Sequence, residues 1–372
     1  MTDAEHGFDT TGRLGPLQEL LDRFIAEGQV EGAAVAVAQG GAQVAELYAG
    51  NAALGRAASA DTLWPLASIS KLYTAAVVMA LVERGLLTLS MTVRSILPEF
   101  DGDGRESVTL RQLLTHTSGI VYESPEMEQR LLAQWSLEQI VNEAYTYPLL
   151  FTPGTRQSYS DYNYALAGRI ASVAAAQPFP ELVRELVLEP GKLGDTFMPP
   201  PRSEYQRLAH VVEPLAYRTD SDMYNSGYAL DLAHPAFGTV ATAGDLLRFG
   251  LLFALNGTQR IFSTATLRTM TTDQTGGNTP GVGFGSEPEA LRPWGIGFSV
   301  KGVTGSGGDL LSPATFGHGG ASGCILQVDP VTDIAVAFVS NKHARTGREP
   351  FSKRQTSVCN VAAAALTNGR ET

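Results

Sequence analysis

The sequence is poor in several features that identify common classes of protein. It has two cysteines, Cys324 and Cys359, in 372 residues, which is too few for a disulfide framework. Neither has the Cys-x-x-Cys or Cys/His spacing of a metal site, so we expect both to be structural thiols. No His-Glu-x-x-His motif occurs among the six histidines, which argues against a zinc hydrolase. No Gly-x-Ser-x-Gly motif occurs either, which excludes the nucleophile elbow of an α/β-hydrolase.

Long apolar runs and basic runs are also missing. No stretch is long enough to span a bilayer, and the first eight residues lack the basic segment and apolar core of a secretory signal. We therefore expect a cytoplasmic protein without a membrane partner. The net charge of -11, without a basic cluster to offset it, argues against nucleic acid as a partner. The remaining composition, 44% hydrophobic and 17% charged, is that of a globular protein of one or two domains.

One short segment, residues 64–71, places a serine and a lysine at a spacing that supports chemistry. Ser68 and Lys71 lie three residues apart, and residues 72–82 carry no charge. If that run is a helix, the two side chains share a face and the buried helix holds its first turn still. A serine hydroxyl needs a nearby base to take its proton, and an amine one turn away can reach it. Burial and the positive end of the helix lower the lysine pKa. The alternative is an N-cap serine and a surface lysine.

The rest of the chain alternates between strand and helix patterns. Residues 16–25 predict a helix, and Gly40-Gly41 predicts a tight turn between strands at 33–38 and 44–48. Helical patterns then begin near Leu110, Ser136, Asp161 and Thr242. Glycine and proline between 276 and 297 predict a long loop. Strand-like content follows at 294–301, 323–328 and 334–340, before an alanine-rich helix at 353–366.

This order predicts an α+β fold in which both ends of the chain build one antiparallel sheet. The N- and C-terminal helices flank the sheet, and a mostly helical domain is inserted between its halves. The expected boundaries are 10–66 with 290–372 for the sheet domain and 67–289 for the helical domain. The candidate active site then lies at their interface.

Four motifs follow one another in the chain. They are Ser68-x-x-Lys71, Leu-Leu-Thr-His-Thr-Ser-Gly at 113–119, Tyr159-Ser160-Asp161 after a Pro-Gly pair, and His318-Gly319-Gly320 before a strand. In this order and spacing they resemble the serine β-lactamase and penicillin-binding-protein superfamily, with its β-lactamase/transpeptidase-like fold. The resemblance runs from about Leu14 to the last helix. It is closest to the class C-like branch that includes the family VIII carboxylesterases.

The resemblance implies a role for each matching residue. Ser68 would be the nucleophile, Lys71 its partner, and Tyr159 the phenol that works with the lysine to deprotonate the serine and returns a proton to the leaving group. A nearby ammonium favours the tyrosinate, which makes this role physically reasonable. The backbone N–H groups of Ser68 and Ala321 would form the oxyanion hole. No metal or organic cofactor is required. The alternative for Tyr159 is an ordinary packed tyrosine.

Two departures from the family pattern carry information about the substrate and the base. His318 stands where the family has the lysine of Lys-Thr-Gly, and a neutral histidine weakens the recognition of carboxylates. The following Gly319 and Gly320 let a substrate approach the strand closely. Asp161 stands where the family has asparagine, and a carboxylate there raises the pKa of Lys71. Our hypothesis is that Lys71 stays charged and Tyr159 is the principal base; the alternative is that Asp161 only caps the following helix.

The sequence therefore predicts a serine hydrolase that cleaves a small-molecule carboxylic ester through an acyl-enzyme. An acyltransferase would use the same acyl-enzyme with an alcohol or amine acceptor. A β-lactamase or D-amino-acid peptidase fits His318 less well. A binding protein that has lost turnover is the alternative from another class, against which Ser68, Lys71 and Tyr159 are all present. We expect His116 to be a buried, hydrogen-bonded structural residue.

Overall fold

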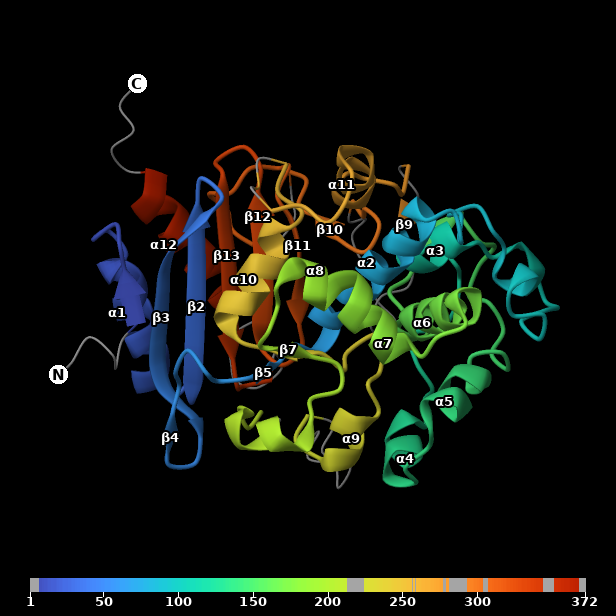
Figure 1. Cartoon of the computed structure of the whole chain (residues 1–372), viewed down its shortest axis with the longest axis horizontal. Coiled ribbons are helices and arrows are strands. Elements are labelled where there is room, and N and C mark those ends of the chain that lie inside the picture. The colour runs from blue at the N-terminus through green and yellow to red at the C-terminus, as the bar shows by residue number, and fades with distance from the viewer. Residues whose placement is uncertain are drawn as a thin grey trace.

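The computed structural model describes residues 7–212, 224–255, 257, 259–276, 279–280, 293–303, 307–343 and 351–367. Its largest element is an antiparallel sheet in the order β1-β3-β2-β13-β12-β11-β10, with β4 paired to β3 (Figure 1). The N-terminal strands are β1 (Gly7–Asp9), β2 (Gly32–Gln39), β3 (Ala42–Ala53) and β4 (Arg56–Ala57). The C-terminal strands are β10 (Ser299–Val300), β11 (Phe316–Gly320), β12 (Cys324–Asp329) and β13 (Ile334–Ser340). The predicted α+β class, with one sheet built from both ends of the chain, is confirmed.

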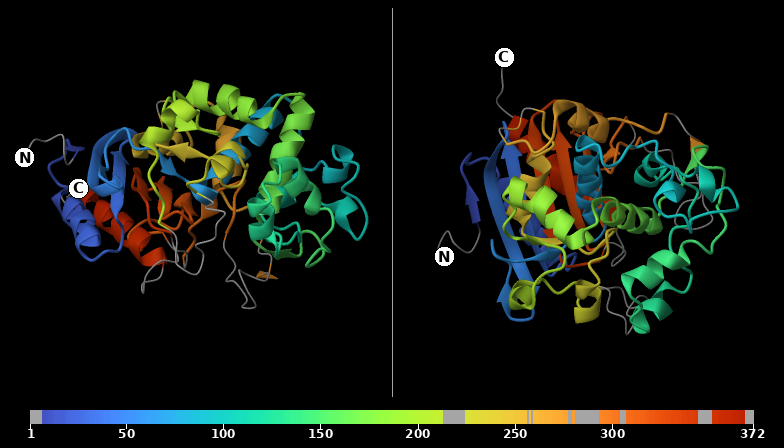
Figure 2. Two further views of the ribbon diagram at one scale, coloured as in Figure 1. Left: turned by 90° about the horizontal axis from the view of Figure 1, so that it is seen from below. Right: turned by 45° about the vertical axis from the view of Figure 1, so that its right-hand side comes forward.

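The side chains of β2 alternate between two apolar cores. Ala33, Val35 and Val37 pack in the core that also holds α1 (Gly15–Ala26) and α12 (Phe351–Thr367). The alanines between them, at 34, 36 and 38, face the larger core on the other side of the sheet. Because successive strand residues point to opposite faces, one strand joins both layers. Figure 2 shows α1 and α12 on one side of the sheet and the helical part on the other.

The helical part surrounds α2 (Ser70–Glu83), which is buried along nearly its whole length and follows a 3₁₀ turn at Ala67–Ile69. The other α-helices are α3 (Leu110–Leu114), α4 (Met127–Leu132), α5 (Leu137–Glu143), α6 (Asp161–Ala175), α7 (Phe179–Val183), α8 (Glu189–Gly191), α9 (Gly227–Asp231), α10 (Ala243–Leu251) and α11 (Thr264–Thr271). A π-helical segment at Arg184–Leu188 joins α7 to α8, and 3₁₀ turns lie at Val93–Ser95, Arg105–Ser107 and Arg202–Arg207. Within the described ranges, every helix falls short of the length and apolar character that a membrane crossing needs.

Several helix starts predicted from the sequence are confirmed by their caps. Ser136 and Gln139 form a capping box at α5, and the Thr242 side chain accepts a hydrogen bond from the backbone N–H of Asp245 at α10. At α6 the N-cap is Ser160, whose side chain accepts from the backbone N–H of Asn163. The alternative that Asp161 serves only as a helix cap is therefore wrong.

The strand predicted over residues 294–301 is wrong for most of its length. Only Ser299–Val300 pair with β11, and Trp294 forms an isolated bridge back to Ser299. The chain turns at Gly297, whose φ is +90°, and a Cβ there would lie 2.4 Å from the Ala75 Cβ of α2. Glycine at this position lets the segment fold back against α2, which an extended strand would not do. The loop predicted between 276 and 297 lies mostly outside the described residues, and the division into two domains stays a prediction.

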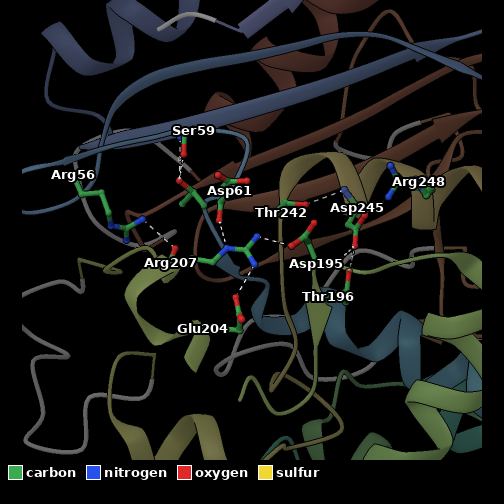
Figure 3. A network of polar contacts seen from close by, with 11 residues as sticks. Arg56, Ser59, Asp61, Asp195, Thr196, Glu204, Arg207, Thr242, Asp245 and Arg248 are labelled. Carbon is green, nitrogen blue, oxygen red and sulfur yellow. Dashed lines mark hydrogen bonds and ion pairs between the residues drawn. The ribbon is translucent and has the colours of Figure 1, made fainter. Parts of the chain in front are cut away.

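A small sheet in the order β5-β8-β7 supports the turn that leads into α2. Its strands are β5 (Trp64–Pro65), β7 (Thr196–Phe197) and β8 (Val240–Ala241), and a parallel pair, β6 (Arg156–Gln157) and β9 (Thr279–Pro280), lies elsewhere. Polar contacts fix this sheet to its surroundings (Figure 3): Arg207 pairs with Asp195 and Glu204, and donates to the backbone carbonyl of Asp61. The buried Asp245 accepts hydrogen bonds from Asp195 N–H and Thr196. The backbone before the candidate nucleophile is thus held from several sides.

Candidate active site

Ser68 lies in a tight turn between β5 and α2 that is pinned by neighbouring backbone. The preceding Ala67 has φ +47°, a left-handed conformation that non-glycine residues adopt rarely and at some cost in energy. The N–H of Leu66 donates to the carbonyl of Thr239 at 2.9 Å. On the other side, a Cβ added to Gly320 of β11 would lie 2.2 Å from the carbonyl oxygen of Leu66. The absence of a side chain at Gly320 is therefore what lets β11 approach this turn.

Lys71 is fully buried, and its amine has two hydrogen-bond acceptors and one ion-pair partner. Nζ lies 3.1 Å from Ser68 Oγ, 3.1 Å from the carbonyl oxygen of Ala236, and 2.6 Å from Asp161 Oδ1. An ammonium group has three N–H donors, and here two hydrogen bonds and one carboxylate charge surround it. Burial lowers the pKa of Lys71 from its ordinary value, and the Asp161 carboxylate opposes that shift, with a smaller contribution from Glu123. The predicted contact between Ser68 and Lys71 is thus present, although Ser68 lies in the 3₁₀ turn before α2 and not on a face of the helix itself.

Tyr159 completes a cluster with these residues. Nζ of Lys71 lies 4.8 Å from the centroid of the Tyr159 ring and 5.8 Å from that of Tyr164. Tyr164 itself is fixed, because its hydroxyl donates to the carbonyl of Leu114 at 3.0 Å. The cluster assembles two parts of the chain. The 3₁₀ turn before α2 supplies Ser68 and the first turn of α2 supplies Lys71; the residues just before α6 include Tyr159, and α6 begins at Asp161.

β11 forms the side of the site that carries the substituted motif. His318 is 6% exposed, and its ring centroid lies 6.0 Å from that of Tyr159 and 5.6 Å from that of Trp294. Its Nδ1 lies 2.6 Å from the carbonyl oxygen of Gly319. Ala321 follows the end of β11 and packs against a small cluster that contains Ala67 and Tyr224. The strand thus brings His318, Gly319, Gly320 and Ala321 next to the turn of Ser68, as the sequence predicts, while their chemical roles stay predictions.

The sequence reasoning missed the segment 233–239, which holds α2 from outside. Besides the Ala236 carbonyl at Lys71, the Pro235 carbonyl accepts from Thr74 Oγ1 at 2.6 Å, and the N–H of Thr239 donates to Ser70 Oγ at 2.9 Å. The segment contributes backbone carbonyls and a backbone N–H group. Every residue except proline has both groups, so the residue types in the sequence do not indicate these contacts. Only the proline and glycine in the segment indicate a turn.

Other predictions concern buried polar side chains near the site. His116 is buried and hydrogen-bonded, which confirms the structural part of its interpretation. Cys324 and Cys359 are buried free thiols, as expected, and burial raises their pKa values to about 11 and about 12. Among the described residues, no group of three or more His, Cys, Asp or Glu side chains is arranged to hold a metal ion.

Comparison with known proteins concerns the whole chain and its fold. The family described as Beta-lactamase matches residues 17–356. Penicillin-binding protein 4 of Amycolatopsis lactamdurans is 29% identical over 339 residues, which are 87% of this chain and 84% of the relative. Esterase EstB of Burkholderia gladioli is 34% identical over 203 residues, 49% of this chain and 50% of the relative. A solved structure, "EstCE1, a hydrolase with promiscuous acyltransferase activity", has a TM-score of 0.77 at 21% identity and covers 96% of this chain and 99% of its own.

Proposed function

The chain belongs to the beta-lactamase family, and we propose that within this family it is a carboxylesterase that works through a covalent acyl-enzyme on Ser68. The observation that carries this proposal is the position of the Lys71 amine, 3.1 Å from Ser68 Oγ and 2.6 Å from Asp161, with the Tyr159 ring alongside. A serine with a hydrogen-bonded amine and a neighbouring phenol has the parts that nucleophilic catalysis needs.

In the proposed reaction, Ser68 Oγ attacks the ester carbonyl carbon while Tyr159, paired with Lys71, takes the hydroxyl proton. The N–H groups of Ser68 and Ala321 stabilise the oxyanion of the tetrahedral intermediate. The C–O bond to the alcohol then breaks, and the proton passes to the leaving oxygen. Water attacks the acyl-enzyme in a second, equivalent step, which releases the carboxylic acid and restores the serine.

Two features support Tyr159 rather than Lys71 as the principal base. A base must be unprotonated when it acts, whereas two hydrogen bonds and a carboxylate 2.6 Å from Nζ stabilise the ammonium form of Lys71 against the effect of burial, which lowers its pKa. The same positive charge next to Tyr159 favours its deprotonated form. Asp161 therefore acts through Lys71, as a residue that keeps the ammonium in place.

The β11 motif and the relatives support an ester substrate. His318 stands where the family's motif has a lysine. At this position β11 therefore offers a histidine, and not a lysine ammonium, to a substrate carboxylate. The name of the relative EstB is that of an esterase, and the motif resembles that of the class C-like, family VIII carboxylesterases. A small, uncharged carboxylic ester is the substrate class that we propose.

Acyl transfer is the second candidate, because the structural neighbour EstCE1 is titled a hydrolase with promiscuous acyltransferase activity. Both reactions share the acyl-enzyme and differ only in the nucleophile that removes the acyl group. The experiment follows p-nitrophenyl butyrate turnover with and without an added alcohol or amine, and compares it with nitrocefin. Faster turnover of the ester than of nitrocefin, with acid as product, supports the esterase. Predominant transfer to the acceptor favours the acyltransferase, and nitrocefin turnover as fast as ester turnover favours a β-lactamase.

A further inference from the structure

We propose that His116 is a positioning residue for Tyr159: its backbone carbonyl and its neutral imidazole each bind the backbone on one side of this tyrosine, and its ring stacks on the tyrosine ring. The proposal rests on the proposed function, because it assigns the cause of Tyr159's placement in that reaction. It goes beyond that function by giving a kinetic role to a residue that is separated from the nucleophile in the sequence.

The residues before and after Tyr159 both donate a backbone hydrogen bond to His116. The N–H of Ser158 donates to the His116 carbonyl at 2.8 Å, and the N–H of Ser160 donates to the His116 side chain, Nδ1, at 3.1 Å. Tyr159 is therefore bracketed by two bonds to one residue. Because Asp161 comes next in the chain, the same bonds place the carboxylate that reaches Lys71.

The hydrogen bonds determine the protonation state of the ring. A backbone N–H can only donate, so Nδ1 of His116 accepts and carries no proton, which leaves the ring proton on Nε2. The Asn163 side-chain amide, at 3.2 Å, is a second donor to Nδ1, and its other end accepts from the Ser118 hydroxyl at 2.7 Å. A proton on Nδ1 would face two donors. Burial, with Lys71 and His318 nearby, lowers the pKa of His116 well below its usual value, in agreement with a neutral ring.

Packing restrains the Tyr159 ring as well as its backbone. The His116 ring stacks on the Tyr159 ring with centroids 4.3 Å apart and an angle of 29° between the planes. The Trp294 ring meets the His116 ring edge-on at 4.9 Å, and Tyr164 lies at 5.2 Å. Stacked rings limit the tilt of the phenol relative to the Lys71 amine, 4.8 Å from the Tyr159 centroid.

The backbone of His116 itself has a conformation that is costly for a non-glycine residue. Its φ is +58°, in the left-handed region, where a Cβ costs about 1–2 kcal/mol. In this conformation the His116 carbonyl accepts the hydrogen bond from the Ser158 N–H, and the His116 Nδ1 accepts the hydrogen bond from the Ser160 N–H. Glycine would adopt this backbone conformation more easily and would keep the carbonyl acceptor for Ser158, but it has no side-chain acceptor for Ser160 and no ring. The side chain therefore does something that the turn alone does not require.

Two variants separate the acceptor from the ring. His116→Asn puts an amide oxygen near the place of Nδ1 and accepts a positive φ, but removes the ring. His116→Phe keeps a ring and leaves the N–H of Ser160 without its acceptor. We expect kcat for p-nitrophenyl butyrate to fall about 10²-fold in His116→Phe, the effect of misplacing a catalytic group by about 1 Å. In His116→Asn we expect a loss of about tenfold, with KM changed less than twofold in both.

The matched control is His210→Asn, the same exchange at an exposed histidine, which we expect to leave both constants unchanged. If the wild type turns over the ester and His116→Phe has the same kcat as the wild type, this inference is overturned and the proposed function stays intact. Absence of ester turnover in the wild type would instead overturn the proposed function.

A measurement on the wild type covers the case in which His116→Phe does not fold. The ¹⁵N chemical shifts of the buried imidazole are expected to show a neutral ring with the proton on Nε2 throughout pH 5 to 8, and His116→Asn assigns the signal. A ring protonated on Nδ1, or one that becomes charged within that range, would contradict the proposal.

Discussion

Replacing Asp161 with asparagine removes one negative charge from the Lys71 ammonium with little change in side-chain size. Asp161 Oδ1 lies 2.6 Å from Lys71 Nζ, and the two side chains are 10% and 0% exposed. An opposite charge this close changes a pKa by about 1–3 units, which corresponds to about 1.4–4 kcal/mol at 1.36 kcal/mol per unit. The carboxylate raises the pKa of Lys71 against the effect of burial, so its loss lowers that pKa.

The assay is the pH dependence of kcat/KM for a p-nitrophenyl ester. In the active form that we propose, Lys71 and Tyr159 together hold one proton. The acid limb of the profile then reports the loss of a second proton from this pair, and the alkaline limb reports the loss of the last one. Removal of the Asp161 charge favours proton loss in both steps. We expect both limbs of the profile to move to lower pH, by about one to three units.

The control is Asp231→Asn, which removes a surface carboxylate that pairs with Arg202 and is expected to leave the profile in place. Asp161→Asn keeps a side-chain oxygen of similar size beside the Lys71 amine, so that the charge is the main thing lost. A folded Asp161→Asn enzyme with the wild-type pH profile would refute the hypothesis that Asp161 keeps Lys71 charged.

Three further predictions test other parts of the account. Gly320→Ala lowers kcat/KM by about 10²-fold, because its Cβ would lie 2.2 Å from the Leu66 carbonyl and push β11 away from Ser68; a normal rate in steady-state kinetics would contradict this close approach. The folded-state pKa of His234 is about 3 because of burial, below its ordinary 6.5, so its contribution to stability is complete above about pH 6.5 and is lost as the pH falls. Between pH 7 and pH 5, the free energy of unfolding measured with urea should fall by about 2 kcal/mol more in the wild type than in His234→Asn; equal decreases in the two proteins would disprove this contribution. Cys324 and Cys359 are 0% exposed with pKa values of about 11 and about 12, so a disulfide reagent should label them only after unfolding, and rapid labelling of the native protein would contradict their burial.

Local patterns predicted the elements that local physics determines. The Gly40-Gly41 turn, the caps at Ser136 and Thr242, and the buried helix after Ser68 all depend on residues close together in the chain. The family resemblance added the order of the motifs, and the structure brings Ser68, Lys71, Tyr159 and Asp161 within one cluster.

Contacts that join distant residues through the backbone could not be predicted. The Ala236 carbonyl reaches Lys71 across 165 positions of the chain, and no residue type marks such an acceptor. The two hydrogen bonds that the N–H groups of Ser158 and Ser160 donate to His116 accompany a positive φ at His116, and the second spans 44 positions of the chain. The residue types at 294–301 favour a strand, but the close approach of Gly297 to Ala75 of α2 determines the conformation of that segment.

The most direct test of the account is to locate the covalent intermediate. Wild type and Ser68→Ala are incubated with a fluorophosphonate and with short-chain p-nitrophenyl esters, and intact mass and peptide mapping record the adducts. The account predicts one adduct, on Ser68, in the wild type, and loss of both labelling and ester turnover in Ser68→Ala. Turnover that survives in Ser68→Ala, or an adduct on another residue, would contradict the assignment of the nucleophile and with it the proposed reaction.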